Sequence, residues 1–246
     1  MPTRRYRKRR SKGSSLSKGQ RKEMQKIAQK TIDRIVEDKS YVHTEENQQL
    51  YHNKPFYVDN FLGDIGQGVQ TGDQNDTGGS GIRAVRIGDE IMLKNFSIKL
   101  WLSNKLDRPN VLYRVALYWY ETTQSPDDEL IYSTQSTKAL DRYNLKSIKL
   151  IRTFTLQSTD NYAQPYYLPV TIGGESVAVT GKEKSYLKTM NKRWNRGKKI
   201  TYDDNGLVPK GWNIGMSVVA YDAYGTEETD NIASFAYNSL ITFQDA

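Results

Sequence analysis

Apolar and polar residues alternate with a period of two in several segments downstream of residue 90. Side chains two positions apart share one face of a strand, so this alternation predicts strands with one buried face. The apolar sets are Val111, Tyr113, Val115, Leu117 and Trp119; Ile148, Leu150, Phe154 and Leu156; and Ala233, Phe235, Tyr237, Ile241 and Phe243. We predict that the segments 111–119, 148–156 and 233–243 are inner strands of a sheet.

Residues 91–102 follow the same alternation, but its phase changes along the segment. Ile91 and Leu93 are odd-numbered, whereas the apolar residues that follow are even-numbered. These later residues are Phe96, Ile98, Leu100 and Leu102. A shift of one residue exchanges the two faces of a strand, so the sequence predicts a β-bulge near Lys94-Asn95 that bends a long strand.

A helical spacing takes the place of this alternation near the N-terminus. Apolar residues recur there every three or four positions, and Lys, Arg and Gln fill the opposite face. They are Met24, Ile27, Ala28, Ile32, Ile35 and Val36. Ser17 is of a residue type that caps helix N-termini. We therefore predict an amphipathic helix over residues 18–38.

The rest of the chain, residues 39–246, has the pattern of one all-β domain. About eight strand-like segments are joined by turns of uneven length, and no second long helical pattern occurs. This pattern is typical of a two-sheet sandwich, and we predict a single jelly-roll sandwich of antiparallel strands that follows the helix. An immunoglobulin-like sandwich is the alternative, because periodicity alone does not separate the two folds.

Two segments of this domain have the composition of exposed loops. Residues 63–81 are rich in glycine and polar residues, which predicts a flexible loop. Residues 122–137 are irregular in pattern, and we expect them at the surface as well.

The charge of the chain is unevenly distributed. The net charge is +8, but residues 1–30 hold twelve Lys and Arg against Glu23 alone, a net +11, which leaves −3 for the remainder. Like charges and few apolar residues prevent residues 1–17 from folding alone, so we predict a disordered basic arm. Such an arm on a nearly neutral domain indicates a polyanionic partner.

Two groups of cations are candidates for binding single-stranded nucleic acid, because guanidinium and ammonium groups grip phosphates without reading bases. The first is Arg4, Arg5, Arg7, Lys8, Arg9, Arg10, Lys12, Lys18, Arg21 and Lys22; the second is Lys192, Arg193, Trp194, Arg196, Lys198 and Lys199. The arm is alternatively a solubility tail or a nuclear import signal. Trp194 either stacks on an unpaired base or packs beneath cationic side chains.

Several functional classes lack their usual residues. The chain has no Cys, only two His (His43 and His52), and no glycine-rich phosphate loop. We therefore expect no enzymatic activity, no cofactor and no metal site. Three acidic pairs or triplets, Asp127-Asp128-Glu129, Asp203-Asp204 and Glu227-Glu228, are read as solvated turns rather than as calcium ligands. No apolar run is long enough for a membrane span or a secretory signal.

The order of segments resembles that of the capsid proteins of small circular single-stranded DNA viruses, the circovirus-like group. The matching stretches are RRYRKRR, IGDEIMLKNFSIKLWL, VLYRVALYWYE, ALDRYNLKSIKLIRTFTLQ, YLKTMNKRWNRGKKITYDDNG, WNIGMSVVAYDAYG and IASFAYNSLITFQDA. The resemblance implies a jelly roll, an icosahedral shell of sixty identical subunits, and an arm directed inward toward single-stranded DNA. The helix over 18–38 is closer to the capsids of satellite RNA viruses, although DNA is the expected cargo.

From this resemblance we expect a virion protein that passes through the host nucleus during assembly. The alternative function is a non-capsid single-stranded nucleic-acid-binding protein that uses the arm together with residues 192–199. A sandwich-fold enzyme or a lectin-like binder with a basic targeting tail is a third, weaker hypothesis.

Overall fold

The computed structural model describes two compact units, Met1–Glu37 and Asp38–Ala246. The residues that the structure describes are 16–35, 38–63, 65–67, 85–105, 108, 110–134, 136–158, 171–172, 175–176, 185–204, 206–223 and 227–245. The predicted arm over 1–17 therefore lies outside the described residues, except for its last two.

Helix α1, Lys18–Ile35, is the described part of the first unit. Its N-terminus is closed by reciprocal hydrogen bonds: the Gln20 N–H donates to Ser17 Oγ at 3.2 Å, and the Ser17 N–H donates to Gln20 Oε1 at 3.0 Å. This capping box confirms Ser17 as the cap. The predicted end of the helix at residue 38 is wrong, because Asp38 leads into a strand whose first residue, Lys39, pairs with Phe243.

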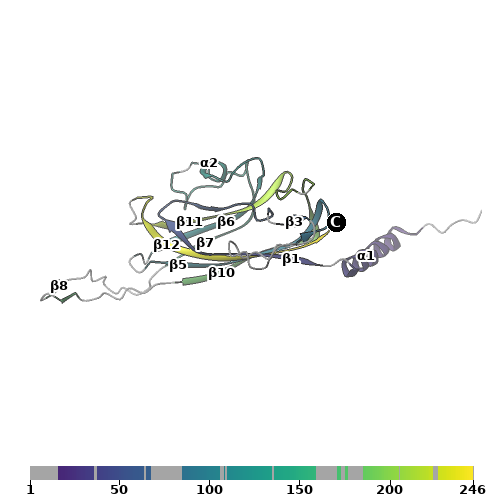
Figure 1. Cartoon of the computed structure of the whole chain (residues 1–246), viewed down its shortest axis with the longest axis horizontal. Coiled ribbons are helices and arrows are strands. Elements are labelled where there is room, and N and C mark those ends of the chain that lie inside the picture. The colour runs from purple at the N-terminus through teal and green to yellow at the C-terminus, as the bar shows by residue number, and fades with distance from the viewer. Residues whose placement is uncertain are drawn as a thin grey trace, which may run out of the picture. The chain divides into compact units, whose positions relative to one another are not determined.

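Eight strands of the second unit form two four-stranded sheets that lie face to face (Figure 1). The first sheet has the order β1 (Lys39–Tyr51), β12 (Asn231–Asp245), β5 (Glu90–Asn104) and β10 (Ser185–Thr201). The second has the order β2 (Phe56–Val58), β11 (Trp212–Asp222), β6 (Val111–Glu121) and β7 (Lys149–Gln157). Two minor pairs are β3 (Gly66–Gln67) with β4 (Val85–Arg86), and β8 (Thr171–Ile172) with β9 (Glu175–Ser176).

The pairing of these strands is nested. The first strand pairs with the last, β1 with β12, and then β2 pairs with β11, β5 with β10, and β6 with β7, all antiparallel. A long hairpin rolled into two sheets gives this order, which is that of a jelly roll. The predicted all-β jelly-roll sandwich is therefore confirmed, and the immunoglobulin-like alternative does not fit the strand order.

The core fills the space between the two sheets, as the alternation predicted. The odd-numbered apolar residues of β6 and of β12 are buried in this core. In β5 the inward-facing residues are odd-numbered up to Leu93 and even-numbered from Phe96 onward. The pairing with β12 skips Lys94, which confirms the predicted bulge. Phe61, which follows β2, stacks edge-on against Phe96 with ring centroids 5.2 Å apart.

Strand β7 departs from the prediction. It is an edge strand of the second sheet rather than an inner strand. Its pairing with β6 shifts between Leu150 and Arg152, so Ile151 packs against the core while Leu150 is 37% exposed. The bulge thus moves Leu150 out of the predicted face, and Ile148, which precedes the strand, packs on the outer side of the sheet with Tyr118.

The segment between β6 and β7 covers the outer face of the second sheet (Figure 1). It contains the short helix α2, Asp128–Ile131, whose Leu130 and Ile131 are buried. Together with Tyr132 and Ile148 they pack against Tyr118 and the other outward residues of β6 and β11, and so form a second apolar cluster. Most described residues of 122–137 are exposed, as expected, but Leu130, Ile131 and Tyr132 are buried, because the sheet beneath them is apolar on both faces.

The predicted glycine-rich loop contains a short strand near its start. Gly66–Gln67 pairs in parallel with Val85–Arg86, while residue 64 and residues 68–84 lie outside the described part. Arg86 is fully buried here: its guanidinium lies over the Tyr202 ring at 4.4 Å and donates to the carbonyls of Ile65 and Gly206. This one side chain joins three segments at one end of the sandwich.

Candidate nucleic-acid interface

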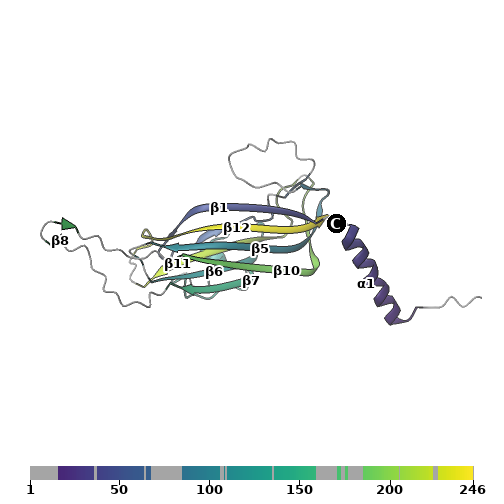
Figure 2. The same cartoon turned by 90° about the horizontal axis from the view of Figure 1, so that it is seen from below.

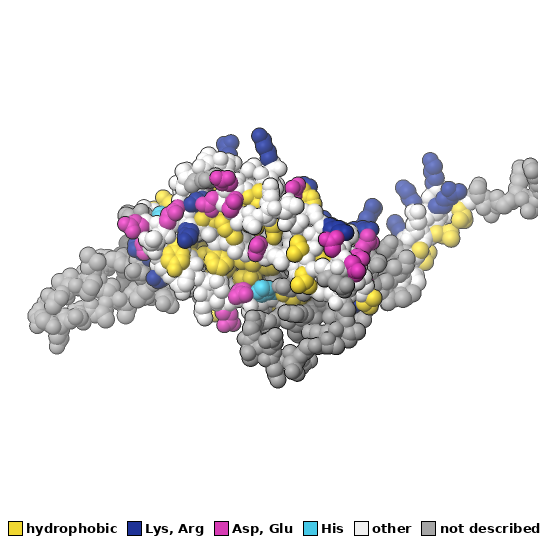
Figure 3. All heavy atoms as spheres, turned by 45° about the horizontal axis from the view of Figure 1, so that its top comes forward, with side chains coloured by type: hydrophobic (Ala, Val, Ile, Leu, Met, Phe, Trp, Pro, Cys, Tyr) yellow, Lys and Arg dark blue, Asp and Glu magenta, His cyan; other side chains and the backbone are white. Residues whose placement is uncertain are grey.

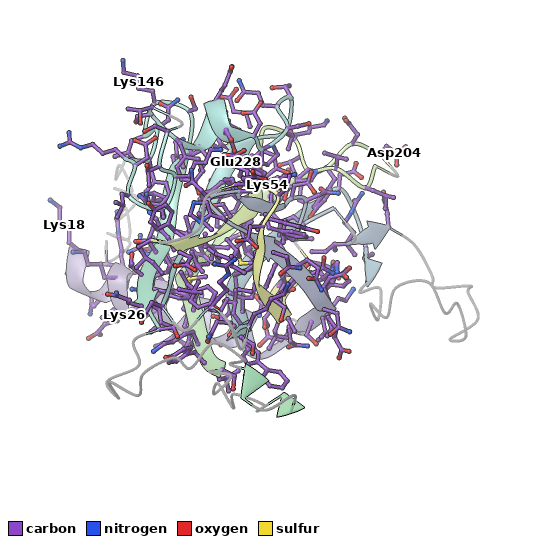
Figure 4. The ribbon with its side chains drawn as sticks, turned by 90° about the vertical axis from the view of Figure 1, so that its left-hand side faces the viewer. Lys18, Lys26, Lys54, Lys146, Asp204 and Glu228 are labelled. Atoms are coloured by element: carbon purple, nitrogen blue, oxygen red, sulfur yellow. The ribbon has the colours of Figure 1, made fainter. Side chains whose placement is uncertain are left out.

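The cations predicted to bind nucleic acid belong to both units of the chain. Arg4, Arg5, Arg7, Lys8, Arg9, Arg10 and Lys12 fall outside the described residues. Lys18, Arg21 and Lys22 are exposed in the first turns of α1, and Figure 4 shows Lys18 and Lys26 pointing outward from this helix. The apolar residues Met24 and Ile27 are also exposed, at 55% and 64%.

The second group lies on β10, the edge strand of the first sheet. Pairing with β5 runs from Arg193 opposite Asn95 to Lys198 opposite Leu93, so residues 194–197 form a wide bulge. Gly197 permits the bulge, because its φ is +74° and a Cβ there would lie 2.9 Å from the Met92 methyl carbon. The bulge lifts Arg196 into solvent while it keeps the strand paired on either side.

Trp194 turns toward the core and is partly buried. Its ring meets Trp119 edge-on at 5.9 Å, and Lys198 Nζ lies 3.4 Å above the centre of Trp119. Burial lowers the pKa of Lys198, and Lys149 lowers it further by charge repulsion. Lys149 itself lies over Trp212 at 3.7 Å. Trp194 thus packs against Trp119, and both alternatives, base stacking and packing beneath cationic side chains, stay predictions.

Strand β7 adds two cations that the sequence analysis did not select. The two sheets both end on this side, one with β10 and one with β7, and Arg152 Nε donates to the Asn191 carbonyl at 3.3 Å. Neither strand contains Asp or Glu. We call their eight cations the basic edge: Lys149, Arg152, Lys188, Lys192, Arg193, Arg196, Lys198 and Lys199.

The basic edge has the chemistry of a phosphate-binding surface. Most of its cations are exposed, and among the described residues Glu90 of β5 forms an ion pair with this edge, its Oε1 2.6 Å from Lys199 Nζ. Exposed Lys and Arg without neighbouring carboxylates bind a phosphate backbone and carry no sequence information. The opposite edge of the first sheet, β1, instead contains Glu45 and Glu46.

The acidic residues weighed as calcium ligands have local partners. Asp127 caps α2 by accepting the Leu130 N–H at 2.7 Å. Asp128 and Glu228 hold Lys138 Nζ at 3.0 and 2.9 Å, and Asp203 pairs with Lys210. Within the described ranges no group of three or more His, Asp or Glu is arranged to hold a metal ion.

Both histidines also have local partners. His43 Nε2 lies 3.0 Å from Glu45 Oε1, and the buried His52 accepts the Asp222 N–H at 3.3 Å. Each side chain therefore serves the packing of the sandwich beside β1.

No family model matches the chain, and no curated protein matches it. No helix in the described part is long and apolar enough to cross a membrane.

Proposed function

We propose that the chain is a structural capsid subunit that assembles into a small icosahedral shell and packages single-stranded nucleic acid through its N-terminal arm. The observation that carries the proposal is the charge division: residues 1–30 hold a net +11, and the sandwich with its connections holds −3. A sandwich domain supplies a rigid wall, and a basic arm supplies counterions for phosphates.

Exposed apolar residues support self-association of the sandwich. Leu140 and Leu145 are 70% and 66% exposed on the segment that covers the second sheet. At the end near Arg86, Ile87 and Leu207 are 76% and 57% exposed, and each adjoins a residue of the Arg86–Gly206 hydrogen bond. Large apolar side chains grouped in this way mark protein contacts.

The arms would supply a large positive charge for packaging. In a shell of sixty copies, residues 1–30 would bring about 660 net positive charges to the interior, each able to displace a counterion from a phosphate. The exposed cations of α1, Lys18, Arg21 and Lys22, continue the arm.

Particle size is the test of this proposal. Purified full-length chain, examined by sedimentation velocity and negative-stain microscopy, is expected to form closed particles of uniform size that contain nuclease-protected nucleic acid. Monomers or dimers alone, at every protein and salt concentration tested, would contradict the proposal.

A second experiment tests the arm. Changing Arg4, Arg5, Arg7, Arg9 and Arg10 to Ala should flatten the log–log salt dependence of single-strand binding by roughly 3 units, if each arginine contacts one phosphate. The particles should then contain little nucleic acid. An unchanged slope and cargo would exclude the arm as the packaging element.

The basic edge favours a second candidate, a non-capsid protein that binds single strands. Eight cations on two neighbouring strands without an acid could guide a phosphate backbone. This candidate predicts small species that coat single strands, so the same sedimentation experiment separates it from a shell.

A further inference from the structure

The outer face of the first sheet presents an exposed indole. Trp101 of β5 is 58% exposed, and its cross-strand neighbours are Leu187 of β10, which is 69% exposed, and Ala236 of β12. Figure 2 shows β1, β12, β5 and β10 side by side, and no described element of the second unit crosses their outer face. The indole is thus exposed on the outer face of this sheet, between β10 and β12.

Among the described residues of β12, β5 and β10 the charges near Trp101 are cations, whereas β1, the fourth strand of this sheet, carries the exposed Glu46 at its bulge opposite Ala236. Lys99 is exposed two positions before Trp101, about 7 Å away along the strand, and its cross-strand neighbours are Thr189 and Asn238. Arg193 is exposed on the same face. It lies opposite Asn95, which is roughly 20 Å from Trp101 along β5. The outward positions of β12, β5 and β10 from residue 95 to 103, with their partners, hold Ser, Thr, Asn, Lys, Arg and apolar residues but no carboxylate.

We propose that this face binds single-stranded nucleic acid by stacking an unpaired base on Trp101 while Lys99 holds a neighbouring phosphate and Arg193 holds a phosphate further along the strand. Aromatic side chains on an open sheet, bordered by cations, are a recurring platform for unpaired bases. This inference deepens the proposed function and rests on it for the cargo, but it uses a different surface from the arm and a different interaction, stacking instead of charge.

A second copy of the chain is the other occupant to consider. A symmetric contact through the outward residues of β12, β5 and β10 would bring Lys99 and Arg193 of two copies together, and these three strands supply no carboxylate there, so such a contact is unfavourable. A polyanion complements the same charges. The hydroxyl and amide side chains beside Lys99 can also donate hydrogen bonds to phosphate or base edges.

The test compares Trp101→Ala with Trp101→Phe in the full-length chain, using fluorescence anisotropy with a labelled oligothymidine at several salt concentrations. Loss of one stacked base should weaken binding by about 5- to 150-fold. Stacking releases no counterions, so the weakening should be the same factor at each salt concentration and the log–log slope should not change. Phe retains an aromatic face and should recover most of the affinity.

Two further readouts decide whether the effect is stacking. A duplex of the same length offers no unpaired base, so Trp101→Ala should leave duplex binding unchanged. Iodouracil-substituted single strands, cross-linked by ultraviolet light to the wild-type chain, should attach to Trp101 in peptide mapping.

Specific outcomes would overturn the inference. Equal affinity of Trp101→Ala and wild type for single strands would do so. A loss of particle assembly by Trp101→Ala with no loss of binding would also do so, because it would assign the face to a second copy. The arm variant described above changes the salt slope and Trp101→Ala does not, so failure of the packaging proposal and failure of this one are distinguishable.

Discussion

The two outer faces of the sandwich differ although the sheets share one core. The second sheet is covered by residues 122–148, and the buried side chains beneath them include Tyr118, Tyr120 and Val219. The first sheet has Lys99 and Trp101 open on its outer face. Figure 3, which brings the covered side forward, shows many acidic side chains on it, whereas the outer face of the first sheet carries cations.

The two outer faces therefore have different expected roles: the covered face stabilises the fold, and the open face is available for binding. A sheet that is apolar on both faces must be covered, so its outer face contributes to stability and not to binding. A sheet with polar outward residues needs no cover and can meet a ligand directly. Substitutions on the covered face should therefore change the free energy of unfolding, and substitutions on the open face should change binding.

The largest expected effect is on the covered face. Ile131→Ala removes a fully buried side chain of α2 and should lower the free energy of unfolding by about 2–5 kcal/mol. Leu187→Ala on the open face is the matched control and should stay within about 0.5 kcal/mol of wild type, because Leu187 is 69% exposed. Urea unfolding measures both. Equal effects would show that the open face is packed in solution.

The next effect concerns Lys138, a buried cation in the segment that covers the second sheet. Lys138 is 7% exposed and joins Asp128 and Glu228. Lys138→Met should lower the free energy of unfolding by about 1–3 kcal/mol, because it leaves Asp128, a partly buried carboxylate, without its cation. Lys146→Met is the control, since Lys146 projects into solvent from the same segment (Figure 4).

The same variant has a defined pH dependence. Burial lowers the pKa of Lys138, but its hydrogen bonds to Glu228 and Asp128 outweigh burial and raise the pKa above its ordinary value of 10.5. A raised pKa of a cation stabilises the fold below 10.5, and this contribution is lost as the pH rises through the folded-state pKa. The stability gap between wild type and Lys138→Met should be constant from pH 7 to about 10 and should narrow above 10.5. A gap that widened there would contradict the ion pair.

The sequence predicted the fold correctly in strands whose apolar alternation allows only one buried face. In β5 and β12 one parity is apolar and the other polar, so the buried face and the bulge at Lys94 could be read directly. In β7 Leu150 and Ile151 are both apolar, and only the pairing with β6 decides which one enters the core. The near-continuous apolar run of β6 was a sign of a covered sheet that alternation alone does not reveal.

The sequence identifies the cations of the candidate site, but it does not show how they are arranged in space. Residues 192–199 stood out as a charge cluster, but Lys149 and Arg152 join it only because the two sheets end on the same side. Trp101 carried a readable signal: it is odd-numbered in a stretch whose even-numbered residues are buried, so it had to face outward. The inward turn of Trp194 depends on the bulge, which pairing across strands determines.

A smaller effect is expected from the bulge on the edge of the open sheet. Gly197→Ala places a side chain at φ +74° and against Met92, which should cost about 1–2 kcal/mol of unfolding free energy. Gly211→Ala is a control with a positive φ of 83° and no neighbour within 4 Å of its Cβ. A loss in Gly197→Ala that exceeds the loss in Gly211→Ala measures the contact with Met92, and equal losses would mean that Met92 moves aside.

The smallest expected effect on stability belongs to Lys99 on the open face. Lys99→Gln keeps most of the length of the side chain and removes its charge, so the free energy of unfolding should stay within about 0.5 kcal/mol of wild type. If Lys99 holds a phosphate beside Trp101, the salt slope of single-strand binding should fall by about 0.7 units. Trp101→Ala should leave that slope intact while it lowers affinity, so the two variants separate charge from stacking on one face. A slope unchanged by Lys99→Gln would leave Arg193 and the arm as the phosphate contacts and would remove Lys99 from the platform.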